Sequence, residues 1–104
     1  MSRRVFAVSH TGQPNKVFFF GFGNLVGDEV PPPDIKFAGR AVKRPNPKIV
    51  LDSGKVVWGC ECWHGPENRW VEFRGRKTVI DVDIDDMRER AKRSDSQNDF
   101  SPED

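Results

Sequence analysis

The residues best suited to chemistry lie close together in the second half of the chain, at Cys60, Cys62 and His64. Thiolate and imidazole groups are the ligands that Zn²⁺ prefers, and His10 would complete a set of four. On one strand these side chains would share a face, about 6.5–7 Å apart, which is wide for two thiolates on one zinc ion. The sequence therefore favours a row of Trp58, Cys60 and Cys62 facing the core, where reduced cysteine acts as a small apolar residue. We expect no bound metal and no cofactor.

A second cluster, formed by Asp81, Asp83 and Asp85, alternates as metal-binding carboxylates do in nucleases. A strand end that runs into a helix explains the same spacing, because Asp83 can cap the helix and Asp85 lies in its first turn. The chain also has only two histidines, no tyrosine and no GxSxG-type nucleophile turn. We therefore expect a protein without catalytic residues that is not an enzyme.

Two tryptophans flank the turn at residues 64–68. If strands pair across this turn, the two indole rings can lie side by side. Tryptophan and arginine are enriched at binding hot spots, and indole rings also stack on bases. The predicted partner-binding residues are therefore Trp63, Trp70, Arg69, Arg74, Arg76 and Lys77. The alternative is that one of the two tryptophans closes the end of the hydrophobic core.

The first part of the chain predicts a hairpin that contains a central strand. Residues 3–9 and 16–22 are rich in β-branched and aromatic side chains, and the stretch between them has the glycine, proline and asparagine of a turn. Both faces of the second strand are apolar, which is typical of a buried strand. The two faces carry Phe18, Phe20 and Phe22 on one side and Val17 and Phe19 on the other.

The second part predicts more strands and one helix. A hairpin joins 48–51 to 55–63 through a turn in which Gly54 supplies a positive φ. Two further strands are expected at 69–73 and 77–82, whereas 34–47 has the glycine and prolines of a long loop with one short strand at most. From residue 84 the apolar residues recur with a helical period, which predicts a short helix over about 84–93. The polar, patternless residues 94–104 predict a disordered acidic tail.

Together these elements predict one mainly β domain over residues 1–93, either a small antiparallel barrel or a curved sheet, with one short C-terminal helix. The run 25–30 resembles the hydrophobic-x-Gly-Asp-x-Val pattern of small SH3-like barrels, so an SH3-like barrel is one form of this fold. The mean hydropathy is −0.67 and no long apolar run is present, so we expect no membrane span. Two cysteines too close for an unstrained disulfide indicate a reduced, cytoplasmic protein.

The charges are distributed unevenly. Residues 1–80 contain 13 Lys/Arg and 7 Asp/Glu, whereas residues 81–104 contain 4 and 9. A basic body with an acidic tail is typical of a protein that binds a polyanion while the tail competes for the same surface. A mixed-charge surface with a solubilising tail is the simpler explanation of the same charges.

The segment 45–67, from Pro45 to Glu67, resembles a segment of small uncharacterised bacteriophage and prophage proteins. The resemblance carries no known activity, and it implies a phage-encoded protein that acts inside a bacterial host. We therefore expect a non-catalytic protein that binds and blocks or sequesters a host component: a defence or regulatory protein, or a nucleotide signal. The alternative is a nucleic-acid-binding module that uses a basic, aromatic β surface. The oligomeric state stays open, and a homo-oligomer is compatible with the sequence.

Overall fold

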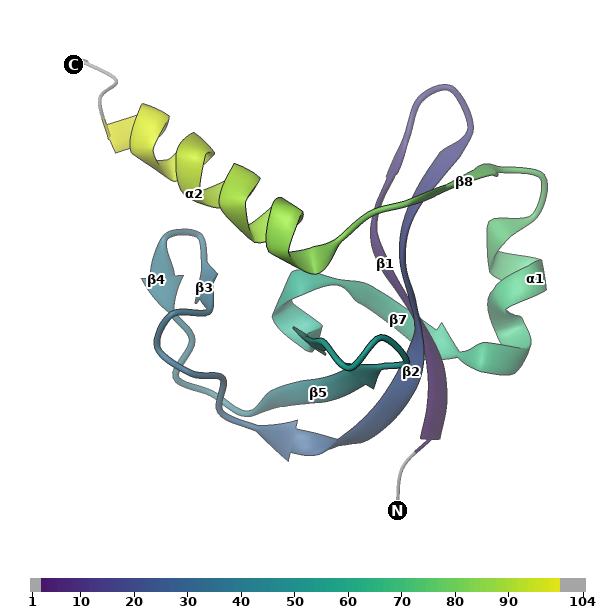
Figure 1. The fold of residues 1–104 in the computed structure, drawn as a ribbon, viewed down its shortest axis with the longest axis horizontal. Helices are drawn as coiled ribbons and strands as arrows, with labels where there is room; N and C mark the ends of the chain where they lie inside the picture. Colours follow the sequence, from purple (N-terminus) through teal and green to yellow (C-terminus); the bar gives the residue numbers. More distant parts are fainter. Residues whose placement is uncertain (1–2, 100–104) are drawn as a thin grey trace.

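The computed structural model describes the backbone of residues 3–99 and the side chains of residues 3–91. Its main feature is one curved sheet with the strand order β6-β5-β2-β1-β7, in which β8 also pairs with β2 (Figure 1). The strands are β1 (Arg3–Gly12), β2 (Lys16–Glu29), β5 (Asn46–Leu51), β6 (Val56–Trp58), β7 (Trp63–Pro66) and β8 (Thr78–Asp81). All pairings are antiparallel except that of β2 with β8. Within residues 3–99 no ladder joins β6 to β7, so the fold is the curved sheet of the prediction and not a closed barrel.

The predicted first hairpin is confirmed, and β2 is the central strand with partners on both sides. The predicted two-face pattern of its side chains changes at a bulge. Ala7 pairs with Gly21 and Val8 pairs with Phe19, which leaves Phe20 as an extra residue without a β1 partner. Gly21 takes the φ of +133° that this irregularity requires. Because one extra residue reverses the alternation, Phe22 packs with Val17 and Phe19, not with Phe20.

The second hairpin is confirmed in β5 and β6, with Gly54 at a φ of +95° in the turn. The predicted strand 55–63 is wrong beyond Trp58. Residues Gly59–Glu61 form a short 3-10 helix, η1, and the chain becomes extended again only in β7. The Glu61 carboxylate accepts a hydrogen bond from the Trp58 backbone N–H at 3.1 Å, which stabilises this turn against a continuous strand.

The predicted strand 69–73 is also wrong, because this segment is helical. A 3-10 turn, η2 (Glu67–Arg69), leads into the helix α1 (Trp70–Arg74). The helical spacing brings Trp70 and Phe73 together against Phe6, with ring centroids 5.4 and 5.0 Å from that of Phe6. Tertiary packing of these rings overrides the β propensity of a segment rich in valine and aromatic residues.

The predicted C-terminal helix is present but longer. The helix α2 spans Ile84–Asp99, so it begins where the sequence predicts and continues past residue 93. The backbone of 94–99 thus continues α2, whereas residues 100–104 of the predicted disordered tail lie outside the described part of the chain. Ile84 is 2% exposed and anchors the start of the helix in the core. None of the helices within residues 3–99 combines the length and apolar character needed to cross a membrane.

The core has two parts on the two faces of the sheet. One contains Val5, Ala7, Ile49 and Val57 with Ile84 of α2, and the other contains Phe6, Val8, Val17 and Phe19 with the rings of α1 packed on it. In Figure 1 the helix α1 lies at the right, whereas α2 and a separate two-stranded hairpin lie at the left. That hairpin, β3 (Lys36–Phe37) with β4 (Arg40–Ala41), occupies the stretch for which the sequence predicted a loop with one short strand at most.

Candidate binding groove

The two predicted tryptophans have different environments. Trp63 begins β7, opposite Val8 of β1, and is 72% exposed. Trp70 is partly buried in α1, where its ring stacks on Phe19 with centroids 4.2 Å apart and meets Phe22 edge-on. The alternative in which one tryptophan belongs to the core therefore describes Trp70, and Trp63 is the surface residue.

The four predicted basic residues follow Trp70 and lie around α1. Arg69 forms an ion pair with Glu72 at 3.2 Å on the surface of the helix. Arg74 ends the helix, and Arg76 and Lys77 lie in the connection to β8. The Lys77 ammonium donates to the Phe73 backbone oxygen at 3.4 Å and lies 5.9 Å from the centroid of the Phe73 ring. Trp63 begins β7, whereas these four basic residues lie in or after the helical segment formed by η2 and α1.

The four candidate zinc ligands divide into two groups. Cys60, Cys62 and His64 line one hollow, whereas His10 lies on β1 and stacks on Phe18 with centroids 4.3 Å apart. Because η1 interrupts the predicted strand, Cys60 and Cys62 do not alternate along one strand as the sequence predicted. Among the described residues, no group of three or more His, Cys, Asp or Glu side chains is placed to hold a metal ion.

Both thiols are harder to ionise than a free cysteine. Burial raises the pKa of Cys60, and the nearby Glu61 carboxylate adds to this effect. Burial raises the pKa of Cys62 further, to about 12, again with a contribution from Glu61. Cys62 packs partly against the core around Ile49, whereas Cys60 lines the surface hollows. The predicted core row of Trp58, Cys60 and Cys62 is therefore wrong for Cys60. Near neutral pH both cysteines are therefore protonated and poor nucleophiles.

Two surface hollows lie between the β3–β4 hairpin and the segment 59–64. The larger one, of about 930 Å³, is lined by the hairpin, the residues that follow it and Cys60. The smaller one, of about 490 Å³, is lined by η1, the start of β7 and Phe37. Phe37 and Cys60 line both, so the two hollows adjoin and form one open groove. We call the residues that line either hollow the groove.

The groove combines exposed aromatic rings with positive charge. Phe37 is 63% exposed, and it lines the smaller hollow together with Trp63. Four exposed basic side chains line the larger hollow: Lys36, Arg40, Lys43 and Arg44. The nine residues 36–44 contain no acidic residue. The acidic residue among the lining side chains is Glu61, whose carboxylate is held by Arg88.

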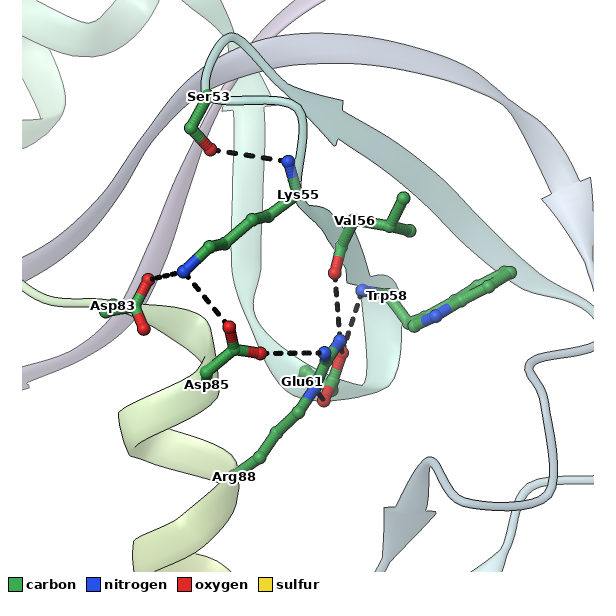
Figure 2. A network of polar contacts seen from close by, with 8 residues as sticks. All are labelled: Ser53, Lys55, Val56, Trp58, Glu61, Asp83, Asp85 and Arg88. Carbon is green, nitrogen blue, oxygen red and sulfur yellow. Dashed lines mark hydrogen bonds and ion pairs between the residues drawn. The ribbon is translucent and has the colours of Figure 1, made fainter.

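Polar contacts fix the wall of the groove that η1 provides (Figure 2). The Arg88 guanidinium donates to Glu61 at 2.7 and 2.8 Å and to the Val56 backbone oxygen at 2.8 Å. The Lys55 ammonium lies 2.5 Å from Asp83 and 3.0 Å from Asp85. These contacts tie the first turns of α2 to β6 and η1, and they position Cys60 and the chain that leads to Trp63.

The sequence prediction identified Trp63 in this groove and missed the hairpin. The missed residues are Lys36, Phe37, Arg40, Lys43 and Arg44. A signal was present, since 36–44 has four basic residues, one aromatic residue and no acidic one. Its proximity to Trp63 depends on tertiary structure, because Phe37 and Trp63 are 26 positions apart in the chain.

When the chain is compared with models of protein families, with curated proteins and with solved structures, none of them matches.

Proposed function

We propose that this protein is a non-catalytic binding protein that holds an anionic partner in the groove. The observation that carries the proposal is the meeting of four cations with two exposed aromatic side chains on one hollowed surface. Cations attract an anion over a distance and steer it to the site. Aromatic rings add contact area at a small cost in conformational entropy.

The state of the thiols supports a binding role for the groove. The thiolate is the nucleophilic form of cysteine, and the surroundings of Cys60 and Cys62 raise the pKa of both. Cys60 is therefore a neutral part of the groove wall near pH 7, where it offers a polarisable, weakly polar surface to a ligand.

The bacteriophage setting implied by segment 45–67 belongs to the same proposal. This segment includes η1 and β7, and so it provides one wall of the groove. We infer a phage-type protein that occupies an anionic component of the host cell and blocks or sequesters it. Nucleotide signals, nucleic acids and acidic patches of defence or regulatory proteins all carry the required charge.

Two charge-reversal variants test whether the groove is the anion-binding surface. The groove variant is Lys43→Glu with Arg44→Glu, and the matched control is Arg74→Glu with Arg76→Glu, which makes the same charge change around α1. We expect the groove variant to bind immobilised heparin much more weakly than the control at the same salt concentration. Equal retention of the two variants would show that the groove is not the site and would overturn the proposal.

A further inference from the structure

We infer that the anionic partner is a single-stranded nucleic acid, whose bases stack on Phe37 and Trp63 while its phosphates contact the cations of residues 36–44. This inference rests on the proposed function, because it names the class of ligand for the same groove. It is carried by the exposure of the two rings, by cations beside them that pair with no carboxylate among the described residues, and by the contacts that hold the wall of Trp63.

The two rings are exposed although the fold buries aromatic side chains elsewhere. Phe6, Phe19 and Trp58 are at most 8% exposed, whereas Phe37 and Trp63 are 63% and 72% exposed. Both line the same hollow, so one ligand can contact both. Every nucleobase has a planar face, and stacking on an aromatic side chain contributes binding energy without requiring a particular sequence.

The cations of residues 36–44 lack the ion pairs that five of the eleven other basic side chains described in the structure form. Arg4, Lys48, Lys55, Arg69 and Arg88 each form an ion pair with a carboxylate. Among the residues that the structure describes, Lys36, Arg40, Lys43 and Arg44 form none. Four exposed cations within nine residues repel one another. The phosphates of a bound nucleic acid would neutralise these charges, and the counterions of the nucleic acid would be released.

The surface near α1 provides an internal comparison. Arg74, Arg76 and Lys77 are also close together in sequence there, but the neighbouring rings of Trp70 and Phe73 are packed against the core. That surface offers charge without exposed aromatic faces. The groove offers both, and this combination distinguishes recognition of nucleic acid from general attraction of anions.

The exposed rings favour a single strand over a duplex. In a duplex the base faces are stacked on one another and cannot reach Phe37 or Trp63, whereas a single strand can present them. Two sets of contacts fix the wall of the groove that carries Trp63. The strand β7 pairs with β1, with Trp63 opposite Val8, and Arg88 holds η1 through Glu61. A ring held in this way loses little freedom when a base stacks on it.

The test measures binding of fluorescein-labelled dT20 by anisotropy, together with heparin binding, for the full chain. The variants are Phe37→Ala, Trp63→Ala, the groove pair Lys43→Glu/Arg44→Glu and the control pair Arg74→Glu/Arg76→Glu. All of these side chains lie at the surface or at a helix end, and circular dichroism verifies that each variant is folded.

If the inference holds, Phe37→Ala and Trp63→Ala each weaken dT20 binding at least about fivefold and leave heparin binding unchanged. The groove pair weakens both ligands. It also lowers the steepness of the salt dependence of dT20 binding, by about 1.4 in the log–log slope, because two phosphate contacts are lost. A dT20–dA20 duplex binds more weakly than dT20 alone.

The other outcomes separate the two proposals. If the groove pair loses heparin binding but the aromatic variants keep wild-type dT20 binding, the groove binds anions without stacking, and the nucleic-acid inference is wrong while the proposed function stands. If poly-glutamate binds as tightly as dT20, the partner is an acidic polypeptide, and the inference is again wrong. If the groove pair and the control pair bind heparin equally, both proposals fail.

Discussion

Arg88 on α2 and Glu61 on η1 form a two-pronged ion pair, with Nε 2.7 Å from Oε2 and Nη2 2.8 Å from Oε1. The Glu61 side chain is only 10% exposed and the Arg88 side chain 31%. The same carboxylate accepts the Trp58 N–H, and the same guanidinium donates to the Val56 backbone oxygen. One pair of side chains therefore connects the C-terminal helix, the end of β6 and the wall of the groove (Figure 2).

We predict that Arg88→Met lowers the free energy of unfolding by about 2–3 kcal/mol, because it leaves the carboxylate of Glu61 desolvated and without its charged partner. Arg90→Met on the same helix is the matched control, since Arg90 is exposed. We expect a change within about 0.5 kcal/mol for that variant. Denaturant unfolding followed by circular dichroism measures both, and equal stabilities would show that the Arg88–Glu61 pair does not hold the helix.

We predict opposite consequences for the two tryptophans. Trp70→Ala removes a ring that contacts Phe6, Phe19, Phe22 and Phe73, and it should cost about 3 kcal/mol of stability. Trp63→Ala removes a ring that is 72% exposed, and it should change stability by no more than about 0.5 kcal/mol. Thermal melts of the two variants test this, and a large loss for Trp63→Ala would place that ring in the core.

Acid should destabilise the fold through the carboxylates that contact Lys55 and Arg4. The Lys55 ammonium holds the pKa of Asp83 below its ordinary value of 3.8, and the Arg4 guanidinium does the same for Asp52. A carboxyl whose pKa is lower in the folded state binds more protons when the chain unfolds. The stabilisation is therefore present above the ordinary pKa and is lost as the pH falls through that value and then through the lower folded value.

Asp83→Asn and Lys55→Met each remove the Lys55–Asp83 contact. We predict that each variant flattens this part of the pH dependence of the melting temperature, and that combining the two flattens it little further. If both single variants keep the wild-type acid profile, the contact with Lys55 does not stabilise the folded state.

Alkaline solution should destabilise the fold through Cys62. Burial raises the pKa of this thiol to about 12 in the folded protein, against an ordinary value of 9.0. Below pH 9 the thiol is protonated in both states and makes no pH-dependent contribution. Between pH 9 and 12 the unfolded chain releases the proton more readily, so the free energy of unfolding falls as the pH rises. Cys62→Ala should show a smaller fall over this range, as measured by urea unfolding at several pH values, and an unchanged slope would contradict the burial of the Cys62 thiol.

Local sequence determined those elements whose physical cause is local. The turn of the second hairpin requires a positive φ, and Gly54 supplies it, so the hairpin could be predicted from a few residues. The apolar character of both faces of residues 16–22 predicted the central position of β2. The change from strand to helical period placed the start of α2 at Ile84, although the polar composition after residue 93 concealed its length.

Tertiary structure decided the rest, because the deciding contacts join residues that are distant in sequence. The segment 69–73 has β-forming residues, yet the rings of Trp70 and Phe73 are buried against Phe6 only when that segment is helical. The strand that would have aligned Cys60 with Cys62 ends at Trp58, because Glu61 binds the Trp58 backbone and Arg88, 27 residues away, holds Glu61. The groove exists because the fold brings the hairpin of Phe37 beside Trp63. The sequence shows that Phe37 and Trp63 are aromatic, but their proximity results from long-range packing that no local sequence pattern encodes.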